Sequence, residues 1–285
     1  MSNSVVDIGK LAKPIDTLVK KIASATGMLY APTHARRMAK AEADAALTKA
    51  HSENAVSDLK RRTATRLMQE EMRKQENMEG ITERAIPQLE DKADASKTDD
   101  DWMANFFEKC RNVSNEEMQQ LWAKILAGEV NKPGSFSKRT ISFLADIDKN
   151  DAESFAALCS FGFGPKREFP IIIDVGDDIY KRNGLSYAAL IHLDSIGLIN
   201  FGNISSFSAS FVGNFIVMPY FGKSLVLNTP ESKLDVGHVI LTPMGKELAP
   251  LTAAKEVDGF LGYMKAHWSS MLDRAHHPEE TPLPS

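Results

Sequence analysis

The sequence predicts a mainly α-helical protein with a smaller α+β part toward its C-terminal end. Residues 33–89 are rich in Ala, Glu, Lys, Arg, Gln and Met, with Gly80 as their only glycine and Pro87 as their only proline after position 33. Such a composition favours long helices. Short β-branched runs bounded by turn-forming residues begin only after Pro165. We therefore expect long N-terminal helices, then a small helical bundle, then a winged-helix-like C-terminal domain.

The 285 residues are enough for about two domains. Residues 90–101 contain no apolar side chain larger than alanine and end in three aspartates, which is typical of a linker. We expect the following segments: an amphipathic helix at 1–30, a coiled-coil-like arm at 31–89, an acidic linker at 90–101, a helical bundle at 102–160, the winged-helix-like domain at 161–255, a C-terminal helix at 256–274 and a disordered tail at 275–285.

The N-terminal segment predicts an amphipathic basic helix, because its apolar residues recur at spacings of three and four. This stripe consists of Val5, Ile8, Leu11, Ile15, Leu18, Val19 and Ile22, and it is flanked by Lys10, Lys13, Lys20 and Lys21. An apolar stripe with lysines at its rim can pack against the protein's own helices or lie on an anionic membrane surface. Packing against the protein's own helices is the commoner outcome, and contact with a membrane surface is the alternative.

The arm has few apolar positions, so its long helices need a partner to be stable, and we expect a homo-oligomer. Residues 1–74 carry 14 basic and 8 acidic side chains, whereas the rest of the chain carries 20 basic and 30 acidic ones. This asymmetry suggests an interaction arm joined to an acidic body. The candidate nucleic-acid contacts on the arm are Arg36, Arg37, Lys40, Lys60, Arg61, Arg62 and Arg66.

The bundle is predicted from helical spacing of large apolar residues. Ser114-Asn-Glu-Glu117 is a capping-box pattern at the start of its second helix. The core positions expected on the first two helices are Trp102, Phe106, Phe107, Met118, Leu121, Trp122, Ile125 and Leu126.

Three stretches of the bundle, 101–108, 113–130 and 132–140, resemble the signature of an uncharacterised bacterial family, domain of unknown function 2806. The pattern over 116–127 also resembles, more loosely, abortive-infection alpha-type phage-resistance proteins. This second resemblance implies a role in phage defence and transfers no catalytic residue. Since the signature positions are explained as core, the signature requires no active site.

The C-terminal half predicts a winged helix from the order of its elements. Ser186 can cap a helix that stops at Gly197, strand-like runs follow, and Leu241-Thr-Pro-Met-Gly-Lys-Glu-Leu248 begins a closing helix. No Lys or Arg stands between Asn183 and Gly222, so the would-be recognition helix cannot neutralise phosphates. A protein-binding version of the fold is therefore favoured over a DNA-binding one.

The sequence has no motif with the residue spacing required for catalysis, cofactor binding or metal binding. Gly222-Lys-Ser224 lacks the upstream glycine of a phosphate loop, and no His-Glu-x-x-His or Cys-x-x-Cys pattern occurs. Asp174, Asp177 and Asp178 follow an isoleucine run but form no catalytic motif with a paired Lys or His or with a second acidic cluster. We assign no catalytic, cofactor-binding or metal residue and expect a protein that is not an enzyme.

The expected function is that of a cytoplasmic interaction or oligomerisation protein with an unidentified protein partner, acting in phage defence or a stress response. The two isolated cysteines fit reduced, buried thiols in the cytoplasm. One alternative is an abortive-infection effector that contacts the inner membrane peripherally through its N-terminal helix. The other is a nucleic-acid-binding regulator that uses the basic arm, which is not favoured.

Overall fold

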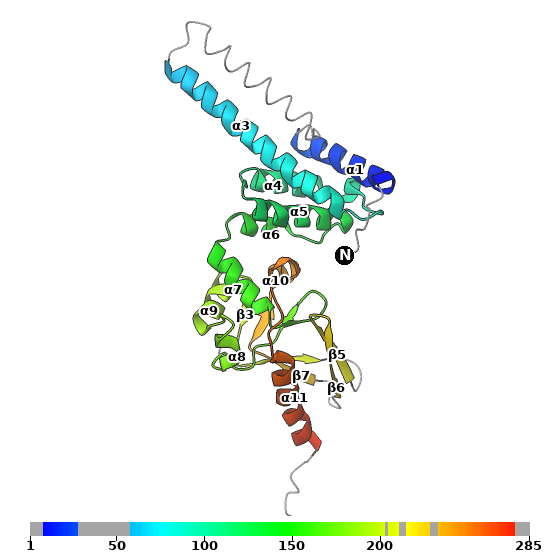
Figure 1. Cartoon of the computed structure of the whole chain (residues 1–285), viewed down its shortest axis with the longest axis vertical. Helices are drawn as coiled ribbons and strands as arrows, with labels where there is room; N and C mark the ends of the chain where they lie inside the picture. Colours follow the sequence, from blue (N-terminus) through cyan, green and yellow to red (C-terminus); the bar gives the residue numbers. More distant parts are fainter. Residues whose placement is uncertain (1–7, 28–57, 203–204, 211–214, 229–232, 277–285) are drawn as a thin grey trace, which may run out of the picture. The chain divides into compact units, whose positions relative to one another are not determined.

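The computed structural model describes residues 8–27, 58–202, 205–210, 215–228 and 233–276 (Figure 1). The chain divides into two compact units, Met1–Asp146 and Ile147–Ser285. The described part is mainly helical, with small two-stranded antiparallel sheets in the second unit, which confirms the coarse fold class. Several sequence predictions lie outside the described residues: Val5, Arg36, Arg37, Lys40, residues 31–57 of the arm and residues 277–285 of the tail.

The first unit is helical. Its elements are α1 (Ile8–Thr26), α3 (Asp58–Ala85), α4 (Asp100–Cys110), α5 (Glu116–Asn131) and α6 (Lys138–Ala145), with short 3-10 turns at Ile86–Gln88 and Ala95–Lys97. Helix α3 packs along α5, while α4 packs against both α1 and α6. Figure 1 shows α3 running on past the end of α5, so that among the described elements of this unit its first turns stand clear of the other helices.

The core of the first unit is built on the signature residues of α4 and α5. Trp102, Phe106, Phe107, Trp122, Ile125 and Leu126 are buried there. Met118 and Leu121 are half-buried and lie at the edge of this core. The Phe106 ring stacks on Trp102 and meets Trp122 edge-on, with ring centroids 5.2 Å apart in each pair.

The predicted capping box at Ser114 is wrong. Asn115 caps α5, because its side-chain oxygen accepts a hydrogen bond from the Met118 N–H at 3.0 Å. Asn is as good an N-cap as Ser, and it stands immediately before the first helical residue. The Ser114 hydroxyl instead accepts a hydrogen bond from the Asn77 side chain of α3 at 3.2 Å.

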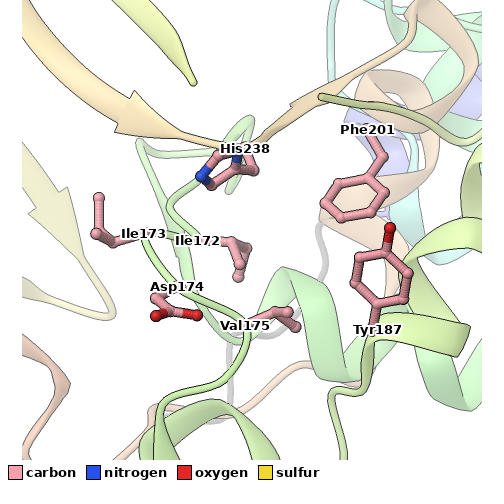
Figure 2. A pocket seen from close by; sticks show the side chains of 7 residues that line it. All are labelled: Ile172, Ile173, Asp174, Val175, Tyr187, Phe201 and His238. Atoms are coloured by element: carbon pink, nitrogen blue, oxygen red, sulfur yellow. The ribbon is translucent and has the colours of Figure 1, made fainter. Parts of the chain in front are cut away.

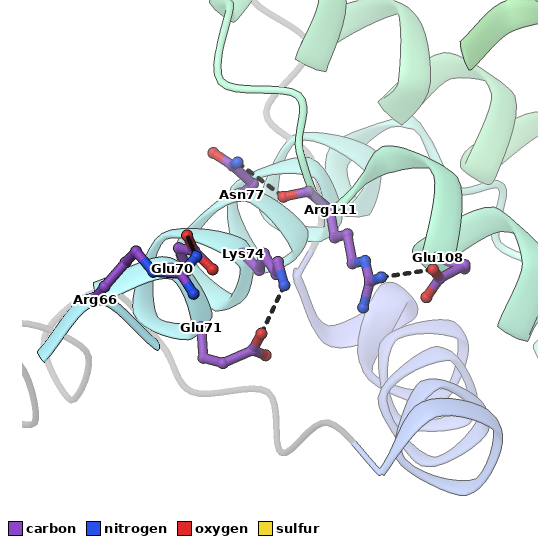
Figure 3. A network of polar contacts seen from close by, with 7 residues as sticks. All are labelled: Arg66, Glu70, Glu71, Lys74, Asn77, Glu108 and Arg111. Carbon is purple, nitrogen blue, oxygen red and sulfur yellow. Dashed lines mark hydrogen bonds and ion pairs between the residues drawn. The ribbon is translucent and has the colours of Figure 1, made fainter. Parts of the chain in front are cut away.

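Polar side chains of α3 form hydrogen bonds with the turn between α4 and α5 (Figure 3). The Asn77 amide donates to the Arg111 carbonyl at 2.9 Å, and the Gln119 amide donates to the Val113 carbonyl at 2.8 Å and to the Asn77 side-chain oxygen at 3.2 Å. Lys74 of the same helix pairs with Glu71 at 2.6 Å. Asn77 and Gln119 are buried, so their hydrogen bonds fix the register of α3 on α5.

Residues 90–101 differ from the predicted linker, since they are packed into the first unit. Ala93, Ala95 and Thr98 are buried, and α1 packs against the turn at Ala95–Lys97. Asp94 caps that turn and Asp99 caps α4, so both carboxylates accept backbone hydrogen bonds. The Trp102 N–H, and then the Lys138 ammonium, hold the pKa of Asp99 below its usual range. The division between the compact units falls instead after Asp146.

A buried carboxylate holds the loop between α5 and α6. Glu129 is 3% exposed, and its two oxygens accept the N–H groups of Gly134 at 2.7 Å and Phe136 at 3.0 Å. The Trp102 indole donates to the Phe136 carbonyl at 2.7 Å. The Lys132-Pro-Gly-Ser-Phe part of the signature is therefore a loop shaped around Glu129.

Replacing Glu129 with alanine is expected to lower the free energy of unfolding by about 3 kcal/mol, because two N–H groups lose a charged acceptor. Glu129→Gln keeps one acceptor oxygen and should cost about half as much. Urea unfolding followed by circular dichroism measures both, with the exposed Gln120→Ala on the same helix as a control. Equal stability of Glu129→Ala and Gln120→Ala would contradict the assigned role.

The second unit combines short helices with paired strands. The helices are α7 (Lys149–Cys159), α8 (Asp178–Lys181), α9 (Tyr187–Ser195), α10 (Pro243–Leu248) and α11 (Phe260–His276), with a 3-10 turn at Ala249–Leu251. The strands are β1 (Gly162–Phe163), β2 (Phe169–Pro170), β3 (Ile199–Phe201), β4 (Phe207–Ser210), β5 (Phe215–Tyr220), β6 (Lys223–Asn228), β7 (Lys233–Gly237) and β8 (Val239–Leu241). The antiparallel pairs are β1 with β2, β3 with β8, β4 with β7, and β5 with β6.

An aromatic cluster forms the core of the second unit. Phe161, Phe163, Tyr180, Tyr220 and Phe260 are all fully buried. The Phe161 ring centroid lies 4.8 Å from that of Tyr180 and 5.0 Å from that of Phe260. The Tyr220 hydroxyl donates to one backbone carbonyl and accepts one backbone N–H, and burial raises its pKa to about 12.

Both cysteines are buried free thiols, as the sequence predicts. Burial raises the pKa of Cys110 well above its usual value and that of Cys159 to about 12. Because only the thiolate is a strong nucleophile, neither side chain is an activated cysteine in this structure.

Candidate functional site

Helix α9 presents an exposed apolar face. Ser186 caps the helix by accepting the Ala189 N–H at 3.1 Å, and Leu190 and Leu193 are buried beneath it. Tyr187 and Ile191, one turn apart, remain 47% and 49% exposed. Residues four apart lie on the same side of a helix, so these two side chains form one apolar patch.

A pocket of about 310 Å³ adjoins this face (Figure 2). The side chains around it come from the loop after β2, the start of α9, the end of β3 and the junction of β7 with β8. They are Ile172, Ile173, Asp174, Val175, Tyr187, Phe201 and His238. The rings of Tyr187 and Phe201 meet edge-to-face, with centroids 5.4 Å apart. Oδ1 of Asp174 accepts the Gly176 N–H at 2.7 Å.

The backbone around His238 forms one wall of the pocket. The His238 N–H donates to the Ile172 carbonyl at 2.8 Å, and Gly237 pairs with Ile172 as an isolated β-bridge. Nδ1 of His238 lies 2.6 Å from the Gly202 carbonyl oxygen. A carbonyl can only accept, so Nδ1 carries the proton of this bond.

Charge on this face is sparse. Between Asn183 and Gly222 the chain has no Lys or Arg. His192 of α9 lies with Nε2 2.6 Å from Asp151 Oδ1 of α7, which ties the two helices together. Helix α9 and the pocket lining therefore offer apolar side chains, a carboxylate and a histidine, but no Lys or Arg to hold phosphates.

The Asp174 pocket was missed from the sequence. The aspartates after the isoleucine run stand out in the sequence, but the histidine that shares the pocket of Asp174 stands 64 residues further along the chain, at His238. The structure brings His238 to the same pocket through the bridge between Ile172 and Gly237, which joins segments about 65 residues apart. No short motif could have signalled this arrangement.

The described basic residues of the arm lie on the exposed first turns of α3. Arg61 and Arg62 pair with Asp58 at 2.7 and 3.0 Å, and Arg66 pairs with Glu70 at 2.8 Å. Lys60 is exposed next to them. Arg61 and Arg62 share the single charge of Asp58, so two carboxylates of the same helix offset two of these four basic charges.

Part of the apolar stripe of the N-terminal helix is buried inside the first unit. Leu18 and Ile22 are fully buried, Ile15 and Val19 are half-buried, and α1 packs against α4. At its rim Lys21 pairs with Asp100 at 2.6 Å and Lys20 pairs with Asp16 at 2.8 Å, while Lys13 is exposed. Ile8, Lys10 and Leu11 belong to the first turns of α1. Within the described ranges, none of the helices is long and apolar enough to cross a membrane.

A second hollow, of about 370 Å³, lies in the first unit beside the loop that Glu129 holds. Its carboxylates already have partners, since Glu129 accepts two loop N–H groups and Asp99 pairs with Lys138 at 3.2 Å. In the part of the chain that the structure describes, no group of three or more His, Cys, Asp and Glu side chains could hold a metal ion. The exposed face of α9 with its adjoining pocket is therefore the stronger candidate site.

A family model described as a protein of unknown function (DUF2806) matches residues 61–265. The chain belongs to the DUF2806 family. This confirms the resemblance noted from the bundle signature. The DUF2806 region extends from α3 to α11 and so contains the α9 face and its pocket, whereas α1 lies outside it. No curated protein and no solved structure matches the chain.

Proposed function

We propose that this DUF2806 protein is a non-enzymatic interaction protein whose second unit binds another protein through the exposed face of α9. The observation that carries the proposal is the pair Tyr187 and Ile191, both about half exposed on a helix without Lys or Arg, beside a pocket whose lining also has none. Aromatic side chains next to a pocket are typical anchors of protein interfaces.

A winged-helix-like arrangement of the second unit is part of this proposal. The order α8, α9, β3 paired with β8, and then α10 supports it, with β4 to β7 as an insertion between the two wing strands. Thr242 caps α10, as expected for the closing helix. In this scheme α9 takes the place of the recognition helix, and its apolar surface suits a protein rather than a phosphate backbone.

Replacing Ile191 with aspartate is expected to abolish partner capture, because it puts a charge into the apolar patch that Tyr187 and Ile191 form. The test is affinity capture from the native host, with bound proteins identified by mass spectrometry. The matched control is Val226→Asp, at an exposed valine of the β5–β6 hairpin in the same unit. Both variants should unfold at the wild-type urea concentration. A partner retained equally by wild type and Ile191→Asp would contradict the proposal.

Self-association through α3 is a second candidate function. Leu59 and Leu67 are 66% and 49% exposed on the turns of α3 that stand clear of the bundle. Residues eight apart lie about 80° apart around a helix, so the two leucines can belong to one apolar stripe that a second helix covers.

A Leu59→Lys, Leu67→Lys double variant is expected to be monomeric where the wild type forms a discrete oligomer, because two lysines in a helix–helix seam would be desolvated without partners. Light scattering at micromolar concentration measures this. Arg61→Lys, which lies about opposite these leucines on the helix and keeps its charge, serves as the control. A monomeric wild type would rule this function out.

The cytoplasmic setting and the process, phage defence or a stress response, stay proposals. The buried free thiols support the first, and the looser resemblance to abortive-infection alpha-type proteins motivates the second. Peripheral membrane contact through α1 would require Leu18 and Ile22 to leave their buried positions. Nucleic-acid binding by the arm would compete with the ion pairs of Arg61, Arg62 and Arg66. We therefore rank both below protein binding.

A further inference from the structure

The geometry points to the identity of the group that the pocket receives: the guanidinium of an arginine on the protein partner. This inference rests on the proposed function and deepens it. It is carried by two features of the pocket, namely a carboxylate with no ion pair among the described residues and a pair of aromatic rings.

The carboxylate is Asp174, which is exposed at the edge of the pocket. The two aspartates that follow it already have partners, since Asp177 accepts a hydrogen bond from Tyr263 and Asp178 pairs with Arg182 at 3.1 Å. The residues that line the pocket include no Lys or Arg. Asp174 uses one oxygen for the Gly176 N–H and has lone pairs left for an external donor.

The rest of the pocket suits the remainder of an arginine side chain. Tyr187 and Phe201 offer ring surface on which a guanidinium stacks, and Ile172 and Val175 offer apolar contact for its methylene stem. The volume of about 310 Å³ lies at the lower end of the range for ligand pockets, which fits a single side chain better than a cofactor.

An anionic group is disfavoured in the same place. Asp174 would repel it, and the nearest stretch of chain on α9 and β3 supplies no basic residue. A lysine ammonium could occupy the pocket, but it lacks the planar face that stacks on rings and the fork that pairs with a carboxylate. The inference therefore commits to arginine, with lysine as the weaker competitor.

N-acetyl-L-arginine amide is the probe, titrated into the full-length protein while amide chemical shifts are followed by NMR. We expect saturable shifts at Gly176 and His238, whose backbone N–H groups border the pocket. N-acetyl-norleucine amide, which keeps an apolar stem but has no charge, should bind about tenfold more weakly, and the lysine derivative should fall between them. No saturable shift with the arginine probe, or equal binding of the norleucine derivative, would overturn the inference.

Two variants test which side chains of the pocket bind the arginine probe. Asp174→Asn keeps a side-chain oxygen for the Gly176 N–H but removes the charge, and it should weaken the arginine probe about tenfold. Phe201→Leu should weaken it about threefold through the lost ring face. Asp178→Asn, a neighbouring carboxylate that does not line the pocket, is the matched control and should change the affinity less than twofold. Undiminished binding by Asp174→Asn would overturn the inference.

Partner capture from the native host distinguishes failure of protein binding through α9 from failure of arginine binding in the pocket. If Ile191→Asp abolishes capture while Asp174→Asn leaves it unchanged, the α9 interface stands and the arginine inference is wrong. If neither variant affects capture, both are wrong. If both variants reduce capture and only Asp174→Asn loses the arginine probe, both are supported.

Discussion

Replacing Trp122 with alanine is expected to lower the free energy of unfolding of the first unit by about 4 kcal/mol. Trp122 is fully buried in α5, and its ring meets that of Phe106 with centroids 5.2 Å apart. Its indole Nε1 has no hydrogen-bond partner among the described residues, so the cost comes from lost packing and the cavity left behind. Urea denaturation followed by circular dichroism measures the change.

Two further variants are compared with Trp122→Ala to show that the loss of stability comes from the buried ring. Trp122→Phe keeps most of the ring and should cost about half as much. Lys124→Ala, at an exposed position two residues along the same helix, should change the stability by less than about 0.5 kcal/mol. A loss with Trp122→Ala no larger than that with Lys124→Ala would mean that the signature helix does not form the core of this unit.

Gly237→Ala is expected to lower the free energy of unfolding of the second unit by at least about 3 kcal/mol and to disrupt the pocket. Gly237 has a φ of +80°, which strains any residue with a side chain. A Cβ there would also lie 2.0 Å from the Ile172 carbonyl oxygen. That oxygen accepts the His238 N–H, so relief of the overlap must move the wall of the pocket.

Gly222 provides the matched control for Gly237. It has a similar φ of +82° in the turn between β5 and β6, but a Cβ there would meet nothing within 4 Å. Gly222→Ala should therefore cost only about 1 kcal/mol, from backbone strain alone. Urea denaturation of both variants, with the NMR shift of the His238 amide, separates strain from overlap. Equal costs would show that the backbones of Gly237 and Ile172 are not in close contact.

The helical bundle could be predicted because the spacing of apolar residues within each short segment is enough to identify each helix. Trp102, Phe106, Trp122 and Ile125 recur at helical spacing, and each helix buries the face that this spacing marks. The β5–β6 hairpin overlaps the strand-like runs expected at 211–218 and 224–228, although β5 is displaced toward the turn. The cap at Asn115 was misplaced by one residue, because two capping residues stand side by side there.

The organisation of the chain was harder to predict, because it depends on contacts rather than composition. Residues 90–101 look like a solvated linker, yet their alanines are small enough to be buried and their aspartates cap neighbouring turns. Helix α7 was grouped with the bundle from its apolar spacing. The structure places it in the second unit, where Asp151 contacts His192 of α9.

The measurement that tests the central claim most directly is site-specific photo-crosslinking within the second unit. A photoreactive amino acid is placed at position 191 on α9 or at position 226 on the β5–β6 hairpin, two exposed aliphatic sites. After irradiation in the native host, a discrete crosslinked partner is expected from position 191 and not from position 226, and it should disappear when Tyr187 is also changed to aspartate. The same crosslinks from both positions, or none from position 191, would contradict binding through the face of α9.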